Sequence, residues 1–193
     1  MQNRTPRIPE QPAPNHPELD ARFTDELAAV LTGARRRALR DGDRQIDTAH
    51  LLHSLIEADP EVREAFDGGP RLAKVLGYLV QRSIGYGLRW QGSVEDSGAV
   101  PVVRDPAVDG WSPSALAALE DALYRAASRG EDRAAGLDLL AALAADAESR
   151  AVEVLARGGV DARWLAGRVA GVLAAEVSWC SPPRASSRQA SRG

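Results

Sequence analysis

Residues 23–42 read FTDELAAVLTGARRRALRDG, and residues 111–130 read WSPSALAALEDALYRAASRG. Each stretch begins with an aromatic residue and a hydroxyl residue, continues with apolar residues at the spacing of an amphipathic helix, and ends in glycine. A serine or threonine in this place accepts a hydrogen bond from the first helical turn, and glycine commonly follows the last turn. The two stretches therefore predict two similar helices in distant parts of the chain.

The similarity of the two stretches continues at a constant offset. Phe23 corresponds to Trp111, which is an offset of 88 residues (111 − 23), and the same offset aligns the residues that follow. The matching pairs are Thr24 with Ser112, Leu31 with Leu119, Ala34 with Ala122, Gly42 with Gly130, Leu51 and Leu52 with Leu139 and Leu140, and Leu55 with Leu143. A register that holds through two helices and their turn indicates a duplicated unit. Such units usually pack together, because one copy cannot bury its apolar face alone.

Further helical patterns complete each half of the chain. Helix starts are predicted at Thr48 and Pro60, and amphipathic patterns follow around residues 72–79, 137–143, 152–155 and 164–173. We therefore predict an all-α fold, an eight-helix pseudo-two-fold bundle made of two four-helix repeats.

The domain boundaries follow from where the periodicity begins and ends. The predicted domain covers residues 22–175, with repeat one at 22–84, a Gly- and Pro-rich connection at 85–110 and repeat two at 111–175. Residues 1–21 and 176–193 are polar and carry no periodicity, so we expect a disordered arm and a disordered tail.

The composition narrows the range of partners. The 193 residues carry a formal net charge of −3, so the chain has no overall basic field that would attract nucleic acid, and nucleic-acid binding is unlikely. No segment has the run of about 20 apolar residues that crosses a membrane, and no signal segment is present. A single cysteine, Cys180, allows no intrachain disulfide and suits a reducing compartment. We expect a cytoplasmic protein that does not enter membranes.

The sequence lacks the motifs of the common catalytic classes. Its one lysine, Lys74, is followed by Val75, so the chain has no P-loop and no ATPase of that type. No Gly-x-Ser-x-Gly element is present, and no histidine lies near Cys180 in the sequence. We therefore expect a protein that is not an enzyme and uses no cofactor.

The residues at the start of each repeat resemble a known family. Phe23-Thr24, Gly42 and TAHLLHSL at 48–55, repeated as Trp111-Ser112, Gly130 and GLDLLAAL at 136–143, resemble the double Clp N-terminal repeat of the Clp/Hsp100 unfoldases. The resemblance is closest to the ClpC class and covers roughly residues 22–175.

The resemblance implies a non-catalytic binding domain. Such a domain recruits substrates or adaptors to an ATP-driven ring, which feeds a ClpP-type peptidase. The partners implied are a Clp ATPase, the ClpP-type peptidase complex, and adaptor or substrate proteins. Because the chain carries no ATPase motif, we expect a stand-alone module that acts as an adaptor or a competing decoy.

The resemblance also implies a candidate ligand site. In the ClpC class a threonine after the opening aromatic contacts the phosphate of phosphoarginine, and a glutamate contacts its guanidinium. The hydroxyl positions match Thr24 and Ser112, whereas the glutamate positions are Ala49 and Leu137. A lost charged hydrogen bond costs about 1.5–3 kcal/mol, so we predict weak or absent phosphoarginine binding. Thr24 and Ser112 also fit plain helix caps.

Three more residues lie near this predicted pocket. Asp47 and Asp138 are acidic neighbours that offer a partial replacement for the missing glutamates, and His50 stands at the histidine of the family motif. A metal site of His50, His53 and Glu57 has suitable helical spacing, but no fourth ligand is evident. We expect a structural histidine and no metal.

An alternative function uses the basic segment of the first helix. Arg35, Arg36, Arg37 and Arg40 cluster within six residues, and the tail adds Arg184, Arg188 and Arg192. A regulator that kept the scaffold would bind DNA or an unrelated protein through these residues. Interspersed acidic residues favour a solvated helix face instead.

Overall fold

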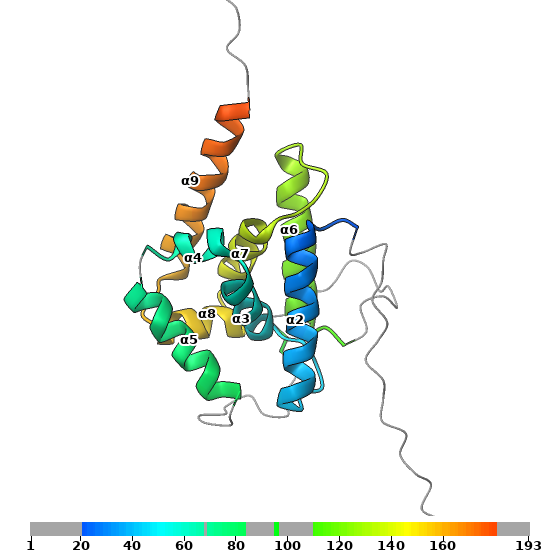
Figure 1. Ribbon diagram of the computed structural model, residues 1–193, viewed down its shortest axis with the longest axis vertical. Helices are drawn as coiled ribbons and strands as arrows, with labels where there is room; N and C mark the ends of the chain where they lie inside the picture. Colours follow the sequence, from blue (N-terminus) through cyan, green and yellow to red (C-terminus); the bar gives the residue numbers. More distant parts are fainter. Residues whose placement is uncertain (1–20, 68, 84–94, 97–109, 181–193) are drawn as a thin grey trace, which may run out of the picture.

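The computed structural model describes residues 21–67, 69–83, 95–96 and 110–180, and most of these residues are helical (Figure 1). These residues form eight helices and no strand, which confirms the predicted all-α bundle of two repeats. The helices of repeat one are α2 (Asp25–Asp41), α3 (Thr48–Ala58), α4 (Pro60–Ala65) and α5 (Gly69–Ser83). Those of repeat two are α6 (Pro113–Ser128), α7 (Gly136–Ala145), α8 (Arg150–Arg157) and α9 (Ala162–Cys180).

The first helix of each repeat begins as the sequence predicts. Thr24 is extended, and its Oγ1 accepts a hydrogen bond from the amide of Leu27 at 3.3 Å. Ser112 has the same conformation, and its Oγ accepts from the amide of Ala115 at 3.1 Å. Gly42 follows α2 with a φ of 73°, a conformation that glycine adopts without strain. Thr24 and Ser112 are therefore helix caps in the structure.

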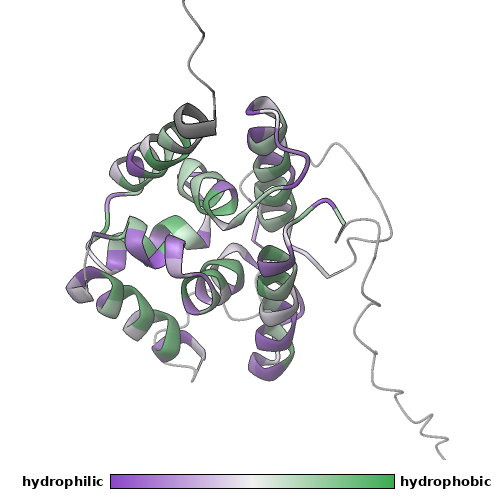
Figure 2. Cartoon of the chain, turned by 45° about the horizontal axis from the view of Figure 1, so that its top comes forward, coloured by the Kyte–Doolittle hydropathy of each residue, from purple (hydrophilic) through white to green (hydrophobic). Residues whose placement is uncertain are grey.

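The second helix of each repeat lies at the centre of the molecule. Helices α2 and α6 stand on one side, and α3 and α7 lie between them and the remaining helices (Figure 1). Nearly every residue of α7 is buried, which is expected of a helix that is apolar all round. In Figure 2 the hydrophobic colour follows the helix faces that meet in the interior. The core is mainly leucine and alanine, with Phe23 and Phe66 fully buried.

The two repeats exchange main-chain hydrogen bonds. Phe23, at the start of repeat one, pairs with Ala134, which precedes the second helix of repeat two. Trp111, at the start of repeat two, pairs with Ile46 of repeat one in the same way. The hydrogen bonds run from Thr24 N to Ala134 O at 3.0 Å, Ala134 N to Arg22 O at 3.0 Å, Ile46 N to Gly110 O at 2.6 Å and Ser112 N to Ile46 O at 2.9 Å. The crossed pairs give the fold its pseudo-two-fold symmetry.

The fourth helices depart from this symmetry. Helix α9 packs along α7, whereas α5 packs mainly on α8 and touches α3 less. Gly158 permits the contact between α5 and α8, because a Cβ atom there would lie 2.3 Å from Val75 Cγ2 and 3.1 Å from the main-chain N and Cα of Val75. Helix α9 also continues past residue 175 to Cys180.

The predicted boundaries are only partly within the described residues. Residues 1–20, most of the predicted connection at 85–110, and residues 181–193 lie outside them. The disordered arm and tail therefore stay predictions. Among the helices described, none is both long enough and apolar enough to cross a membrane.

The contact at Gly158 predicts a stability difference between two glycine-to-alanine changes. Gly158→Ala is expected to lower the free energy of unfolding by about 1–3 kcal/mol, because α5 must move to admit the new methyl group. Gly77→Ala, on α5 with nothing within 4 Å of the added Cβ, is expected to raise it by about 0.5–1 kcal/mol. Urea unfolding of both variants measures the effect, and equal stability of the two would contradict the α5–α8 packing.

Candidate functional site

The hydroxyl of Ser112 faces a carboxylate from the connection between the repeats. Ser112 is fully buried, and its Oγ donates a hydrogen bond to Glu95 Oε2 at 2.9 Å while it caps α6. The resemblance placed a phosphate-type contact at this hydroxyl. The structure places the chain's own Glu95 against it.

Glu95 is bound at the first turns of two helices. Its Oε2 accepts from the amide of Thr48 at 2.8 Å, and its Oε1 accepts from the amide of Arg150 at 2.7 Å. The hydroxyl of Thr48 donates to Glu95 as well. Amides at a helix N-terminus are unpaired within the helix and carry partial positive charge, so two such ends form a strong anion site. Glu95, only 5% exposed, fills that site.

A second carboxylate lies at a comparable place in the other half. The 88-residue offset aligns Thr48 with Gly136. Asp59 Oδ1 accepts from the amides of Glu61 and Val62 at the start of α4, at 2.9 and 3.3 Å. Its Oδ2 lies where a Cβ on Gly136 would come within 1.9 Å. The start of α7 is therefore covered by Asp59, and only glycine fits beside it. The Thr24 hydroxyl accepts its hydrogen bond from the amide of Leu27, within the first turn of its own helix.

The residues at the family's glutamate positions are part of the core. Ala49 is fully buried and Leu137 is 3% exposed, so neither position offers an acceptor to a ligand. Asp138 does bind a guanidinium, but an internal one: Arg129 donates to both of its oxygens, at 2.6 and 2.9 Å. A pair of this fork-to-fork kind is strong and geometrically specific.

Asp47 is likewise engaged by internal cations. Its Oδ2 accepts from Arg82 at 2.5 Å and from Arg150 at 2.6 Å, and its Oδ1 accepts from the amide of His50 at 2.9 Å. Burial acts to raise the pKa of Asp47, but the hydrogen bonds and positive charges of His50, Arg82 and Arg150 outweigh burial and hold that pKa far below its usual range. Asp47 is therefore a fixed anion that joins α3, α5 and α8.

His50 and His53 occupy different environments, although they lie one turn apart. Burial acts to lower the pKa of His50, yet its hydrogen bonds with Asp43 and Asp47 raise it above the ordinary value. Burial and the charge of Arg37 lower the pKa of His53 to about 4. His50 contacts Asp43 and Asp47, whereas His53 contacts Arg37 and Glu57, so the two rings face different partners.

Within the described part of the chain, one cluster has the right atoms for a metal ion. Single ligand atoms of Asp43, Asp47 and His50 lie within 4.8 Å of one another. Arg82 already contacts both aspartates, and Arg150 contacts Asp47. Two guanidinium groups at the same carboxylates repel a further cation. The arrangement fits a salt-bridge network better than a metal centre.

Known structures share this arrangement of helices. The N-terminal domain of the caseinolytic-protease-associated chaperone ClpD from Arabidopsis thaliana superposes with a TM-score of 0.56 and 20% identity, covering 80% of this chain and 96% of that one. A structure from work on a malarial protein secretion system gives a TM-score of 0.58 and 13% identity, with 84% and 99% covered. No family model and no curated protein sequence matches the chain. The fold is that of a Clp N-terminal domain, as the sequence predicted.

Sequence reasoning did not find the central residue of the site. Glu95 lies in a connection without periodicity, and its partners are 47, 17 and 55 positions away along the chain. The sequence pattern marks Thr48 only as a helix start, and nothing in it distinguishes Arg150 from the other arginines. A buried acid in a Gly-rich segment leaves no local pattern that identifies its partners.

Replacement of Glu95 tests the closed anion site. Glu95→Gln keeps the shape of the side chain, but its NH₂ group would face the N–H and O–H donors of Thr48, Ser112 and Arg150. The change is expected to lower the free energy of unfolding by about 1.5–3 kcal/mol. Glu131→Gln, at an exposed position, should change it by less than about 0.5 kcal/mol. Chemical denaturation of both variants checks this, and a Glu95→Gln variant as stable as the control would contradict the assignment.

The two core histidines are expected to titrate on opposite sides of the ordinary value near 6.5. His53 should titrate near pH 4, so its contribution to stability is complete above about pH 6.5 and is lost as the pH falls toward 4. His50 should titrate above 6.5, so its contribution is lost as the pH rises through its folded-state pKa. Imidazole NMR shifts, assigned with His53→Gln, measure both values. Ordinary values for both residues would contradict the described environments.

Proposed function

We propose that this chain is a non-catalytic protein-binding module of a Clp-related system. The observation that carries the proposal is the Clp N-terminal domain fold, with both repeats present and joined by the crossed pairs at Phe23 and Trp111. In finer terms, the module captures substrate or adaptor proteins of a Clp ATPase with its ClpP-type peptidase, and acts as an adaptor or a decoy.

The polar groups near the candidate pocket support binding without chemistry. Asp47, Asp138 and Glu95 are each held by internal donors. A catalytic acid or base must reach the proton of a substrate, and these carboxylates face other parts of the same chain. They act as structural ties between helices.

Phosphoarginine is not the ligand that this arrangement favours. A phosphate at Ser112 would have to displace Glu95 and replace its hydrogen bonds to Thr48 and Arg150. The positions that would receive the guanidinium are apolar at Ala49 and Leu137. We therefore propose that the module recognises protein surfaces or unmodified side chains.

The basic segment of α2 gives little support to DNA binding. Arg37 is bound to Ser54 and Glu57, Arg40 contacts Asp41, and Arg35 lies over the ring of Trp111 at 5.4 Å. These arginines therefore do not form one uniform surface of unpaired charge, which phosphate contacts require. A partner protein is the better-supported ligand.

Affinity capture tests the proposed function. The tagged chain is expected to enrich a Clp ATPase, its peptidase or their clients from the native lysate, as read by mass spectrometry. Arg36→Glu should leave this enrichment unchanged, because Arg36 is exposed and lies far along α2 from the start of that helix. A Thr24→Ala/Ser112→Ala variant, checked for folding by circular dichroism, is expected to reduce it, because both hydroxyls hold the starts of α2 and α6. Enrichment of nucleic-acid-associated proteins alone, lost in Arg36→Glu, would contradict the proposal.

A further inference from the structure

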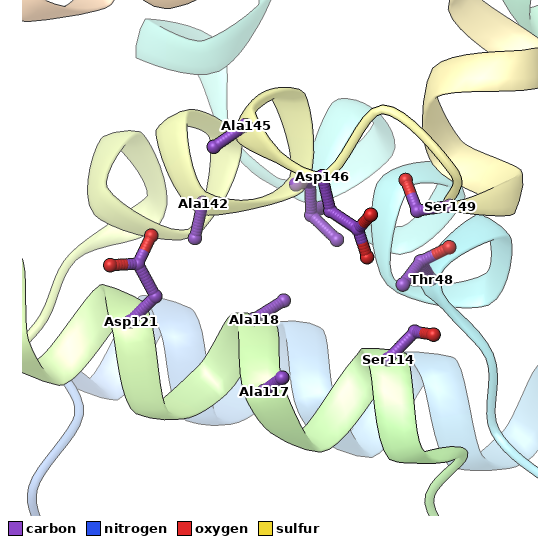
Figure 3. A pocket seen from close by; sticks show the side chains of 10 residues that line it. Thr48, Ser114, Ala117, Ala118, Asp121, Ala142, Ala145, Asp146 and Ser149 are labelled. Carbon is purple, nitrogen blue, oxygen red and sulfur yellow. The ribbon is translucent and has the colours of Figure 1, made fainter. Parts of the chain in front are cut away.

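A cavity of about 400 Å³ lies between α6 and α7, close to the start of α3. Its apolar walls are mainly alanine, namely Ala117, Ala118, Ala142 and Ala145, together with Leu143. Its polar groups are Thr48, Ser114, Asp121, Asp146 and Ser149. Figure 3 shows Asp121 on α6 and Asp146 just after α7, at opposite ends of the opening. The cavity is thus a groove of small side chains with a carboxylate at each end.

In repeat one, an arginine of the same repeat lies at the corresponding place between α2 and α3. Arg37 Nε donates to Ser54 Oγ at 3.2 Å, and the guanidinium also binds Glu57. A further nitrogen of Arg37 lies 3.2 Å from His53 Nδ1. The Arg37 side chain is only 13% exposed. The space between the first two helices of a repeat can therefore hold an arginine side chain.

The residues that hold Arg37 are replaced in repeat two. At the 88-residue offset Ser54 and Glu57 correspond to Ala142 and Ala145, so their hydroxyl and carboxylate are absent. Arg125, the counterpart of Arg37, instead donates to Asp121 at 2.8 Å, and both side chains are more than one third exposed. Arg125 therefore lacks the buried contacts that Arg37 makes, and the carboxylates of Asp121 and Asp146 lie at the groove.

The groove has the chemistry to receive an arginine from another molecule. Its alanine walls suit the three methylenes of an arginine stem, and a carboxylate accepts the planar fork of a guanidinium. Arg125 uses one oxygen of Asp121, and the amide of Glu148 uses Oδ1 of Asp146. Each carboxylate has two oxygens with several lone pairs, so both retain acceptor capacity. The cavity volume lies within the range of about 300–1,000 Å³ that is usual for ligand pockets.

We propose that this groove binds an unmodified arginine side chain in a peptide segment of a partner protein. The inference rests on the proposed function as a protein-binding module and names the site and the chemistry of recognition. A phosphorylated arginine carries negative charge toward the two carboxylates, so this groove discriminates against it. The site is separate from the carboxylate-filled position at Ser112.

A pair of matched peptides tests the proposal directly. The probe is an N-acetylated, C-amidated pentapeptide, Ala-Ala-Arg-Ala-Ala, and its control carries citrulline, which has the same shape without the charge. Each is titrated into the full ¹⁵N-labelled chain. We expect the arginine peptide to shift the amides of Ala117, Ala118 and Ala142 and to bind about tenfold or more tightly than the citrulline peptide. Equal binding of both peptides, or shifts confined to other helices, would overturn the proposal.

Substitutions in the groove supply the matched variants. Asp146→Asn keeps the oxygen that accepts from Glu148 but removes the charge, and it is expected to weaken binding about fivefold or more. Ala117→Leu, at a half-buried position, should fill the groove and abolish the shifts. Asp132→Asn, exposed and outside the groove, should bind as the unmodified chain does. Circular dichroism and melting temperature confirm that each variant is folded, and unchanged affinity in a folded Asp146→Asn variant would reject the site.

The proposed function and the arginine site fail in different ways. If affinity capture enriches Clp components equally with the Asp146→Asn variant and the arginine peptide does not bind, the groove assignment is wrong and the proposed function stands. If the arginine peptide binds at the groove but no Clp component is captured, the proposed function is wrong and the groove assignment stands.

Discussion

The fold depends on the crossed main-chain pairing between the two repeats. On either side of Phe23, the amide of Thr24 and the carbonyl of Arg22 bind Ala134, and the amide and carbonyl of Ile46 bind Gly110 and Ser112. If the repeats separated, these groups would exchange their partners for water, and the buried side chains of Phe23 and Trp111 would be exposed. We therefore expect each repeat to be much less stable alone than in the assembled domain. The starts of α3, α6 and α8 are consequently held together as one site.

Internal charged side chains occupy three places where a ligand could otherwise bind. Glu95 binds the N-terminal amides of α3 and α8, Arg129 binds the carboxylate of Asp138, and Arg37 lies between α2 and α3. Arg129 and Arg37 are paired with carboxylates, and Glu95 is hydrogen-bonded, as burial requires. The comparison of the two repeats identifies one exception. The groove beside Asp121 has alanines where Ser54 and Glu57 hold Arg37 in repeat one. Differences between the repeats, more than their similarity, thus point to the surface that is open to a partner.

The sequence predicts much of the fold because its signals are local. Helices α2 and α6 carry their caps at Thr24 and Ser112 and their apolar stripes within one stretch, and the 88-residue register shows that the unit is repeated. Contacts between distant residues leave no such signal. The placement of Glu95 and the shift of α5 onto α8 at Gly158 depend on the assembled bundle. For the same reason the sequence located the hydroxyls of the candidate site but not the carboxylate that fills it.

Native-state hydrogen exchange at the crossed pairs tests the central claim most directly. The amides of Thr24, Ile46, Ser112 and Ala134 donate the four main-chain hydrogen bonds of the crossed pairs. If the repeats are one cooperative unit, all four amides should exchange only through global unfolding, with the same free energy as chemical denaturation gives. If the amides of one pair exchange at a clearly lower free energy than the other pair and the core of α7, the repeats open separately. That result would contradict the account of a single interlocked module.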